Sequence, residues 1–180
     1  MTYKYPKGWI EERSNIGDLP ITQESMASQS SVVSTADKTI KVKIAMYVGG
    51  GMGGACDPDG PVLDWFGYEK SQNLPGFSYV EYIYRDKYAN NQWAVRQGIG
   101  DGRGKDVAAI KAGNSYCDVM NATSSPLAKF TSVGYSPMLV TNITPYGSDG
   151  LVYFGTLAEA KNYLASDNAK HIKAIFLSIK

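Results

Sequence analysis

The sequence predicts an α+β fold, with one β-rich domain over residues 40–180, a C-terminal β-α-β unit and an extended N-terminal arm over residues 1–39. From residue 40 onward, short apolar stretches alternate with glycine, proline and asparagine, which is typical of strands joined by turns. A helix-start signal stands between two apolar stretches near the C-terminus. The first 39 residues lack a sustained apolar period. A length of 180 residues fits one domain with an arm better than two full domains.

The predicted arm contains a serine-rich stretch at residues 25–37, which cannot bury enough apolar surface to fold alone. Such an arm is either disordered or ordered by contact with a neighbouring subunit. Tyr3, Tyr5 and Trp9 favour the second alternative, because a solvated tail seldom carries so many large apolar side chains. We therefore expect these three aromatic residues to contact another chain.

Several segments of the domain are predicted as strands. Residues 40–48 alternate between apolar and lysine positions, and residues 77–84 are rich in aromatic and β-branched side chains. Less regular candidates are residues 92–99, 115–123 and 135–144. Pro137 interrupts the last of these, which predicts an edge or bulged strand. Residues 105–112 predict a short helix ended by Gly113.

The C-terminal residues predict the β-α-β unit. Residues 151–154 form a short apolar strand, and Thr156 with Glu159 forms a capping box that starts a helix. Asp167 ends that helix in this interpretation. Residues 172–179 carry apolar side chains on both faces, as a central strand covered on each side would.

A glycine run formally contains the GxGxxG spacing of a dinucleotide-binding turn, at Gly49, Gly51 and Gly54. That turn binds pyrophosphate only when the third glycine opens a helix, whose N-terminal N–H groups hold the anion. Pro58 and Pro61 stand where the first helical turns would be. The run is therefore interpreted as the hinge of a long loop over residues 48–77.

This loop carries Trp65, Phe66 and Tyr68 and is expected to reach for another protein surface. In the strand at residues 77–84, alternation places Tyr82 and Tyr84 on the face opposite Phe77 and Tyr79, so one aromatic set is expected to face outward or against a partner. The predicted interface residues are Tyr3, Tyr5, Trp9, Trp65, Phe66, Tyr68, Tyr82 and Tyr84.

A second glycine cluster precedes Lys105 but misses the phosphate-binding P-loop pattern. Ile99 stands where that pattern requires glycine, and Asp106 stands where it requires serine or threonine. A glycine-rich turn before a short helix is the simpler interpretation. If an anion binds here, its contacts are Arg103, Gly104 and Lys105.

No catalytic, metal or cofactor motif is found. His171 is the single histidine, and the GxSxG elbow is absent. The aspartates around residue 58 miss the spacing of a calcium loop. Cys56 and Cys117 are expected to be free thiols, with a bridge only if the fold brings them together. The sequence predicts a protein that is not an enzyme and needs no cofactor.

Composition points to protein partners. The net charge is +1 with no basic block, so no nucleic-acid footprint is visible. No stretch is apolar enough for a membrane span or a signal-peptide core, so we expect synthesis in the cytoplasm and no membrane partner. Only 19% of residues are charged while 13 are tyrosine, a bias typical of interface cores.

These features predict a non-enzymatic structural or assembly protein that forms a homo-oligomer or a larger assembly. A virion component of a tailed phage fits the composition. The alternative is a small-ligand or nucleotide-binding domain that uses one of the glycine clusters.

Overall fold

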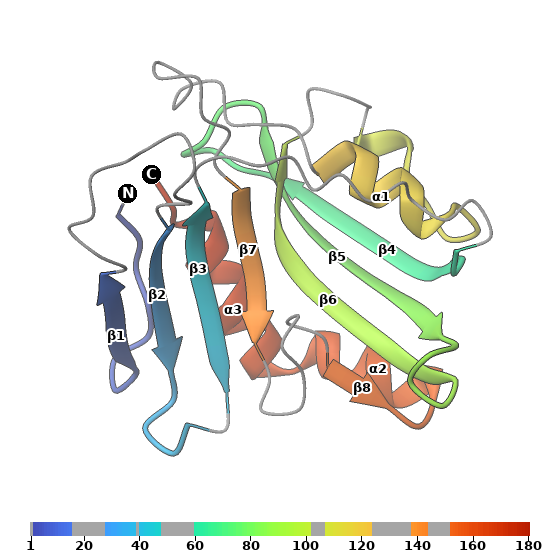
Figure 1. Cartoon of the computed structure of the whole chain (residues 1–180), viewed down its shortest axis with the longest axis horizontal. Coiled ribbons are helices and arrows are strands. Elements are labelled where there is room, and N and C mark those ends of the chain that lie inside the picture. The colour runs from blue at the N-terminus through green and yellow to red at the C-terminus, as the bar shows by residue number, and fades with distance from the viewer. Residues whose placement is uncertain are drawn as a thin grey trace.

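Two antiparallel four-stranded sheets and two helical layers form an α+β, β-rich fold, as the sequence predicts (Figure 1). The structure is a computed structural model. It describes residues 2–15, 28–38, 40–47, 60–101, 107–123, 138–143 and 152–180.

The first sheet has the strand order β1-β2-β3-β7. Its members are β1 (Ile10–Asn15), β2 (Ser28–Ser34), β3 (Lys41–Tyr47) and β7 (Met138–Ile143). The predicted strand at residues 40–48 is confirmed as β3. β7 ends the strand order of this sheet and pairs with β3 through a register shift between Val42 and Ala45. The alternative of a bulged strand is therefore confirmed, whereas Pro137, which suggested it, lies outside the described residues.

The predicted N-terminal arm is part of this sheet. β2 pairs antiparallel with both β1 and β3, and Val33 is completely buried. The expectation of an arm outside the domain is therefore wrong for these strands. The serine-rich sequence does not predict β2, because one buried valine is too weak a periodic signal. The strand forms because its neighbours supply backbone hydrogen bonds whatever its side chains are.

The residues before β1 are tied to the C-terminal residues. Thr2 and Lys180 exchange backbone hydrogen bonds of 3.3 and 3.0 Å. The Lys4 N–H donates to the Ser178 hydroxyl at 2.8 Å. The two ends consequently lie side by side, next to the first sheet (Figure 1).

The second sheet has the order β4-β5-β6-β8. Its members are β4 (Leu63–Lys70), β5 (Phe77–Asp86), β6 (Gln92–Asp101) and β8 (Val152–Phe154). The predicted strands at residues 77–84, 92–99 and 151–154 are confirmed. The long loop over residues 48–77 is a wrong prediction where β4 lies, because a bulge between Leu63 and Trp65 breaks the alternation that identifies a strand.

α2 (Leu157–Ala165) and α3 (Asp167–Leu177) follow β8. The predicted capping box is confirmed: the Glu159 N–H donates to the Thr156 hydroxyl at 3.2 Å, and the Thr156 N–H donates to the Glu159 carboxylate at 2.9 Å. Ser166 separates the helices and caps α3, accepting from the Ala169 N–H at 3.3 Å. α2 therefore ends where predicted, but a second helix begins at once.

The predicted strand at residues 172–179 is wrong, and with it the β-α-β unit, because this segment belongs largely to α3. The residues that α3 and the turn after it bury recur every three or four positions, namely Ala169, Ile172, Ile175, Phe176 and Ile179. Over eight residues, such a stripe is hard to distinguish from a strand buried on both faces. Asp167 stabilises the helix start, where a negative charge is favoured, instead of ending the previous element.

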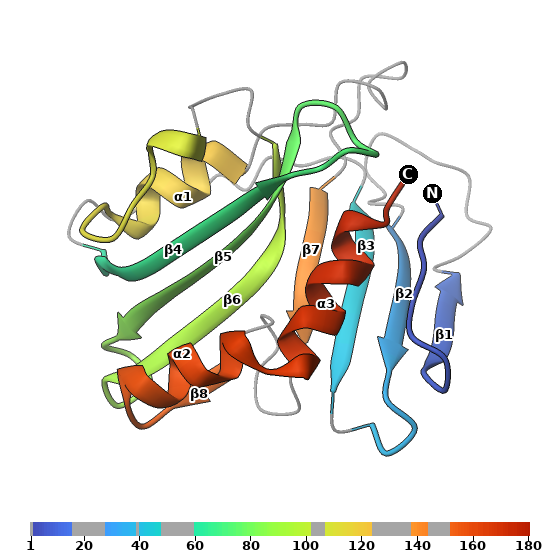
Figure 2. The ribbon, with the colours of Figure 1, turned by 180° about the vertical axis from the view of Figure 1, so that it is seen from behind.

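α3 joins the two sheets. One core cluster combines side chains of the first sheet, the second sheet and α3, and its buried members are Val33, Val42, Phe77, Tyr79, Ile99, Ile172, Ile175, Phe176 and Ile179. Figure 2 shows α3 crossing this face of the molecule, with α2 beside β8.

The opposite face of the second sheet is covered by η1 (Val107–Ala109) and α1 (Tyr116–Thr123). The predicted strand at residues 115–123 is wrong. Ser115 and Asp118 begin a helix instead, because the Cys117 N–H donates to the Ser115 hydroxyl and the Ser115 N–H donates to Asp118. In the described part of residues 105–112, the predicted helix is only the short turn η1, and Gly113 follows with a φ of +90°.

The helical state of the last segment can be tested with two neighbouring substitutions. Ile175→Ala should lower the free energy of unfolding by about 2–5 kcal/mol, because Ile175 is completely buried. Ala174→Glu should change it by less than about 1 kcal/mol, because Ala174 lies on the exposed face of α3. Urea unfolding measures both. A large loss in Ala174→Glu would contradict the helix, since a doubly covered strand buries this position.

Candidate functional site

The aromatic residues of β4 lie at the outer edge of the second sheet. Phe66 and Tyr68 point to the face covered by η1 and α1, and their rings stack with centroids 6.4 Å apart. Tyr68 is 42% exposed, whereas Phe66 is half-buried. Trp65 points to the other face and packs near Ile83. The predicted interface residues Trp65, Phe66 and Tyr68 are thus brought together on one strand.

Among the described residues, backbone groups along this edge of β4 have no partner. The Ser71 N–H donates to the Phe77 carbonyl at 2.9 Å, so the backbone groups of Gly67 and Glu69 also face β5. Those of Phe66 and Tyr68 consequently face away from the sheet. In the described part of the chain, only the start of β4 has an outer partner, where Leu63 exchanges hydrogen bonds with residues 113 and 114.

Trp65 covers the one glycine of this strand. A Cβ built on Gly67 would lie 2.5 Å from the far end of the Trp65 indole, so the ring lies directly over the glycine. Aromatic coverage of this kind protects a strand glycine that has no side chain of its own to pack. The edge is consequently held as an ordered strand.

Tyr82 and Tyr84 belong to the core, contrary to the expectation that one aromatic set faces outward. Their side chains are 4% and 6% exposed. Tyr116 of α1 covers them, with ring centroids at 6.0 and 5.1 Å. Both faces of β5 are therefore buried within one chain, because residues 107–123 supply a cover that the pattern of β5 cannot reveal.

The N-terminal aromatic residues pack on their own chain. Tyr3 and Trp9 lie against the core cluster beneath α3, and the Tyr3 hydroxyl donates to Glu11. The Trp9 ring meets His171 edge to face at 6.2 Å between centroids. Tyr5 is 39% exposed and is the most accessible of the three.

Three other sequence-derived sites lie outside the described residues: the glycine run at residues 49–54, Cys56, and the anion contacts Arg103, Gly104 and Lys105. Cys117 is described and is disulfide-bonded. The expectation of a free thiol is therefore wrong for this residue, because spacing along the chain does not reveal which cysteines the fold brings within bonding distance.

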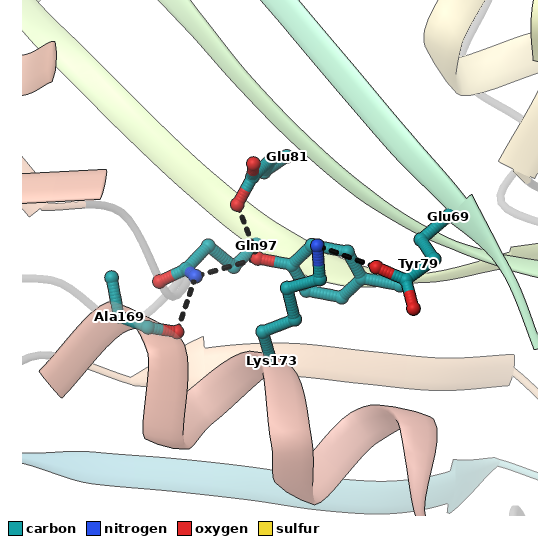
Figure 3. Close-up of polar contacts among 6 residues, drawn as sticks. All are labelled: Glu69, Tyr79, Glu81, Gln97, Ala169 and Lys173. Atoms are coloured by element: carbon teal, nitrogen blue, oxygen red, sulfur yellow. Dashed lines mark hydrogen bonds and ion pairs between the residues drawn. The ribbon is translucent and has the colours of Figure 1, made fainter. Parts of the chain in front are cut away.

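A buried polar network links β5, β6 and α3 (Figure 3). Gln97 is completely buried, and its amide nitrogen donates to the Tyr79 hydroxyl at 2.6 Å and to the Ala169 carbonyl at 3.1 Å. The Tyr79 hydroxyl donates to Glu81 at 2.6 Å. The Gln97 carbonyl oxygen has no partner among the described residues. Sequence reasoning missed this network, because its members are far apart in the chain.

Lys173 closes the network toward solvent. Its ammonium group lies 2.7 Å from the Glu69 carboxylate and 5.3 Å from the centre of the Tyr79 ring (Figure 3). Burial is the main reason why the pKa of Tyr79 lies well above its ordinary value, and the nearby Glu81 carboxylate raises it further. The Tyr79 hydroxyl therefore stays protonated and cannot act as a base at neutral pH. The network fixes α3 on the sheet.

A cavity of about 310 Å³ opens beside the end of β4. Its lining residues include Tyr68, Lys70, Ser71 and Ser78, which offer one ammonium group and three hydroxyls, and Val107 of η1. This volume is at the lower end of the range for small-molecule sites.

The described residues contain no group of three histidine, cysteine, aspartate or glutamate side chains able to hold a metal ion. His171 is exposed on α3. In the part of the chain that the structure covers, no helix is both long and apolar enough to cross a membrane.

The chain matches no protein-family model, no curated protein and no solved structure.

The buried tyrosines predict alkaline sensitivity. Burial, followed by the neighbouring Tyr116, raises the pKa of Tyr84 above its ordinary 10.0, so unfolding releases a proton at alkaline pH. The free energy of unfolding should therefore fall as pH rises through about 10. Tyr84→Phe should reduce this slope by up to about 1.4 kcal/mol per pH unit.

The control for this measurement is Tyr88→Phe, because Tyr88 is 84% exposed. Urea unfolding between pH 8 and about 11.5 gives the slopes. Equal slopes in the two variants would show that Tyr84 ionises in the folded protein as readily as in the unfolded chain.

Proposed function

We propose that the protein is a non-enzymatic structural protein that assembles with other protein chains, first of all with copies of itself. The observation that carries this proposal is the outer edge of β4, where the backbone groups of Phe66 and Tyr68 face away from the sheet beside a 42% exposed tyrosine. Unpaired strand edges readily pair with another chain, and proteins that stay monomeric blunt them.

The side chains of this edge support the same conclusion. Trp65, Phe66 and Tyr68 are large aromatic residues of the type enriched at the centres of protein interfaces. Because Tyr82 and Tyr84 belong to the core, the residues expected to contact another chain are those of β4 together with Tyr5. A virion of a tailed phage remains the proposed setting, and its support is the low charge and high tyrosine content of the sequence.

The chemistry of the described residues supports a non-enzymatic role. The Tyr79 hydroxyl is held protonated and Cys117 is disulfide-bonded. Neither group is poised to act as a general base or nucleophile at neutral pH.

Self-association is the direct test. We expect sedimentation velocity at increasing protein concentration to show a species heavier than the 19.6 kDa chain, with a fraction that grows by mass action. The assembly proposal would be contradicted if the chain stayed monomeric at every concentration, both alone and when mixed with candidate partners.

A second candidate function is small-ligand binding, which the cavity beside Lys70 favours. The ammonium group of Lys70 and the hydroxyls of Tyr68, Ser71 and Ser78 suit an anionic ligand such as a phosphorylated metabolite or a nucleotide.

Thermal unfolding tests this candidate. ATP or inorganic phosphate at a hundred times its dissociation constant should add about 2.7 kcal/mol to the free energy of unfolding. Lys70→Gln should reduce the gain, whereas Lys161→Gln, on the exposed side of α2, should not. An absent shift with both probes would exclude the anion-binding candidate.

A further inference from the structure

We propose that two copies of this chain pair through β4, antiparallel across a two-fold axis centred on Gly67, so that the second sheets of the two copies form one continuous sheet. This inference rests on the proposed assembly function and identifies its partner and register.

The free length of the edge fixes the centre of the pairing. At one end, Pro61 and Leu63 are bonded to residues 113–116, and at the other end the chain turns away at Ser71, whose N–H returns to Phe77. Within the described part of the chain, the edge without a partner therefore runs over residues 64–70. Its midpoint is Gly67, and a two-fold axis at the midpoint uses the whole edge of both copies.

The side chains are self-complementary in this register. Asp64 lies opposite Lys70 of the second copy, and Phe66 lies opposite Tyr68 of the second copy, each pair occurring twice across the axis. Cross-strand pairs of opposite charge and of aromatic residues are the stabilising kinds. Gly67 meets Gly67 at the axis, and the Trp65 ring of each copy covers the glycine of its own strand.

The backbone agrees with the same register. The Phe66 and Tyr68 backbone groups face outward, and these two residues stand opposite one another in the pair. Each such pair exchanges both of its hydrogen bonds in an antiparallel ladder. A shift by two residues in one direction would place Lys70 opposite Val62, whose outer side is occupied by Ser115. A shift by two residues in the other direction would place Lys70 opposite Phe66. Either shift would remove the pair between Asp64 and Lys70.

Other sheet ends in the described chain are less suited to self-pairing. β8 has only three residues, and β7 lies beside β6. β1 carries the consecutive charges Glu11, Glu12 and Arg13, which discourage edge pairing. β4, with eight residues, is the longest of these strands, and it combines aromatic side chains with a charge of each sign at its two ends.

Charge exchange tests the register. Asp64→Lys and Lys70→Asp should each weaken the dimer at least about tenfold at low salt, because two attractive pairs become two repulsive ones. The double variant Asp64→Lys/Lys70→Asp should restore wild-type affinity, and an equimolar mixture of the two single variants should form a heterodimer. Lys161→Asp on α2 is the matched control and should leave the dimer unchanged. Sedimentation equilibrium gives the dissociation constants.

Hydrogen exchange tests the backbone pairing independently. The N–H groups of Phe66 and Tyr68 should exchange slowly in the dimer and fast at concentrations where the chain is monomeric. A dimer that ignores the charge variants would overturn β4 pairing but leave the assembly function intact. Slow exchange at every concentration would show that the edge is covered within one chain, and this result would also overturn β4 pairing. A chain that never dimerises would overturn both proposals.

Discussion

The packing of α3 across both sheets is the contact on which the rest of the fold depends. Val33 and Val42 of the first sheet share one core cluster with Tyr79 of the second sheet and Phe176 of α3. Among the described residues, the two sheets have no hydrogen-bonded strand in common. Gln97 fixes how the helix is placed, since its buried amide must satisfy Tyr79 and the backbone of α3 together. A hydrophobic side chain there would fill space without fixing this alignment.

This arrangement decides which surface of the second sheet is left for contacts. α2 and α3 cover one face, and α1 and η1 cover the other, so both faces of β5 are buried. In the described part of the chain, β4 ends this sheet, and its outward backbone groups lie in the plane of the sheet. A sheet covered on both faces offers another chain its edge, and the side chains along that edge then determine which partner fits.

Local signals in the sequence were sufficient where a few neighbouring residues decide the structure. Thr156 and Glu159 form the capping box that their spacing predicts, and the aromatic stretch at residues 77–84 is β5. The prediction was wrong where distant contacts decide. The bulge in β4 breaks the alternation by which a strand is recognised. The short apolar run at residues 172–179 fits a helix and a strand equally well, and it belongs largely to α3. The ring that covers Tyr82 belongs to Tyr116, in a separate segment of the chain.

The candidate site shows the same division. The sequence predicts Trp65, Phe66 and Tyr68 as contact residues on a long loop, whereas the structure places them on β4. This difference matters energetically. A loop that orders on binding loses conformational entropy of about 1–2 kcal/mol per backbone residue, which subtracts from the affinity of the contact. β4 is already bonded to β5, and Trp65 already covers Gly67, so pairing needs little further ordering. In the proposed dimer, a pre-ordered edge would also have a defined register, which would allow Asp64 and Lys70 to discriminate between partners.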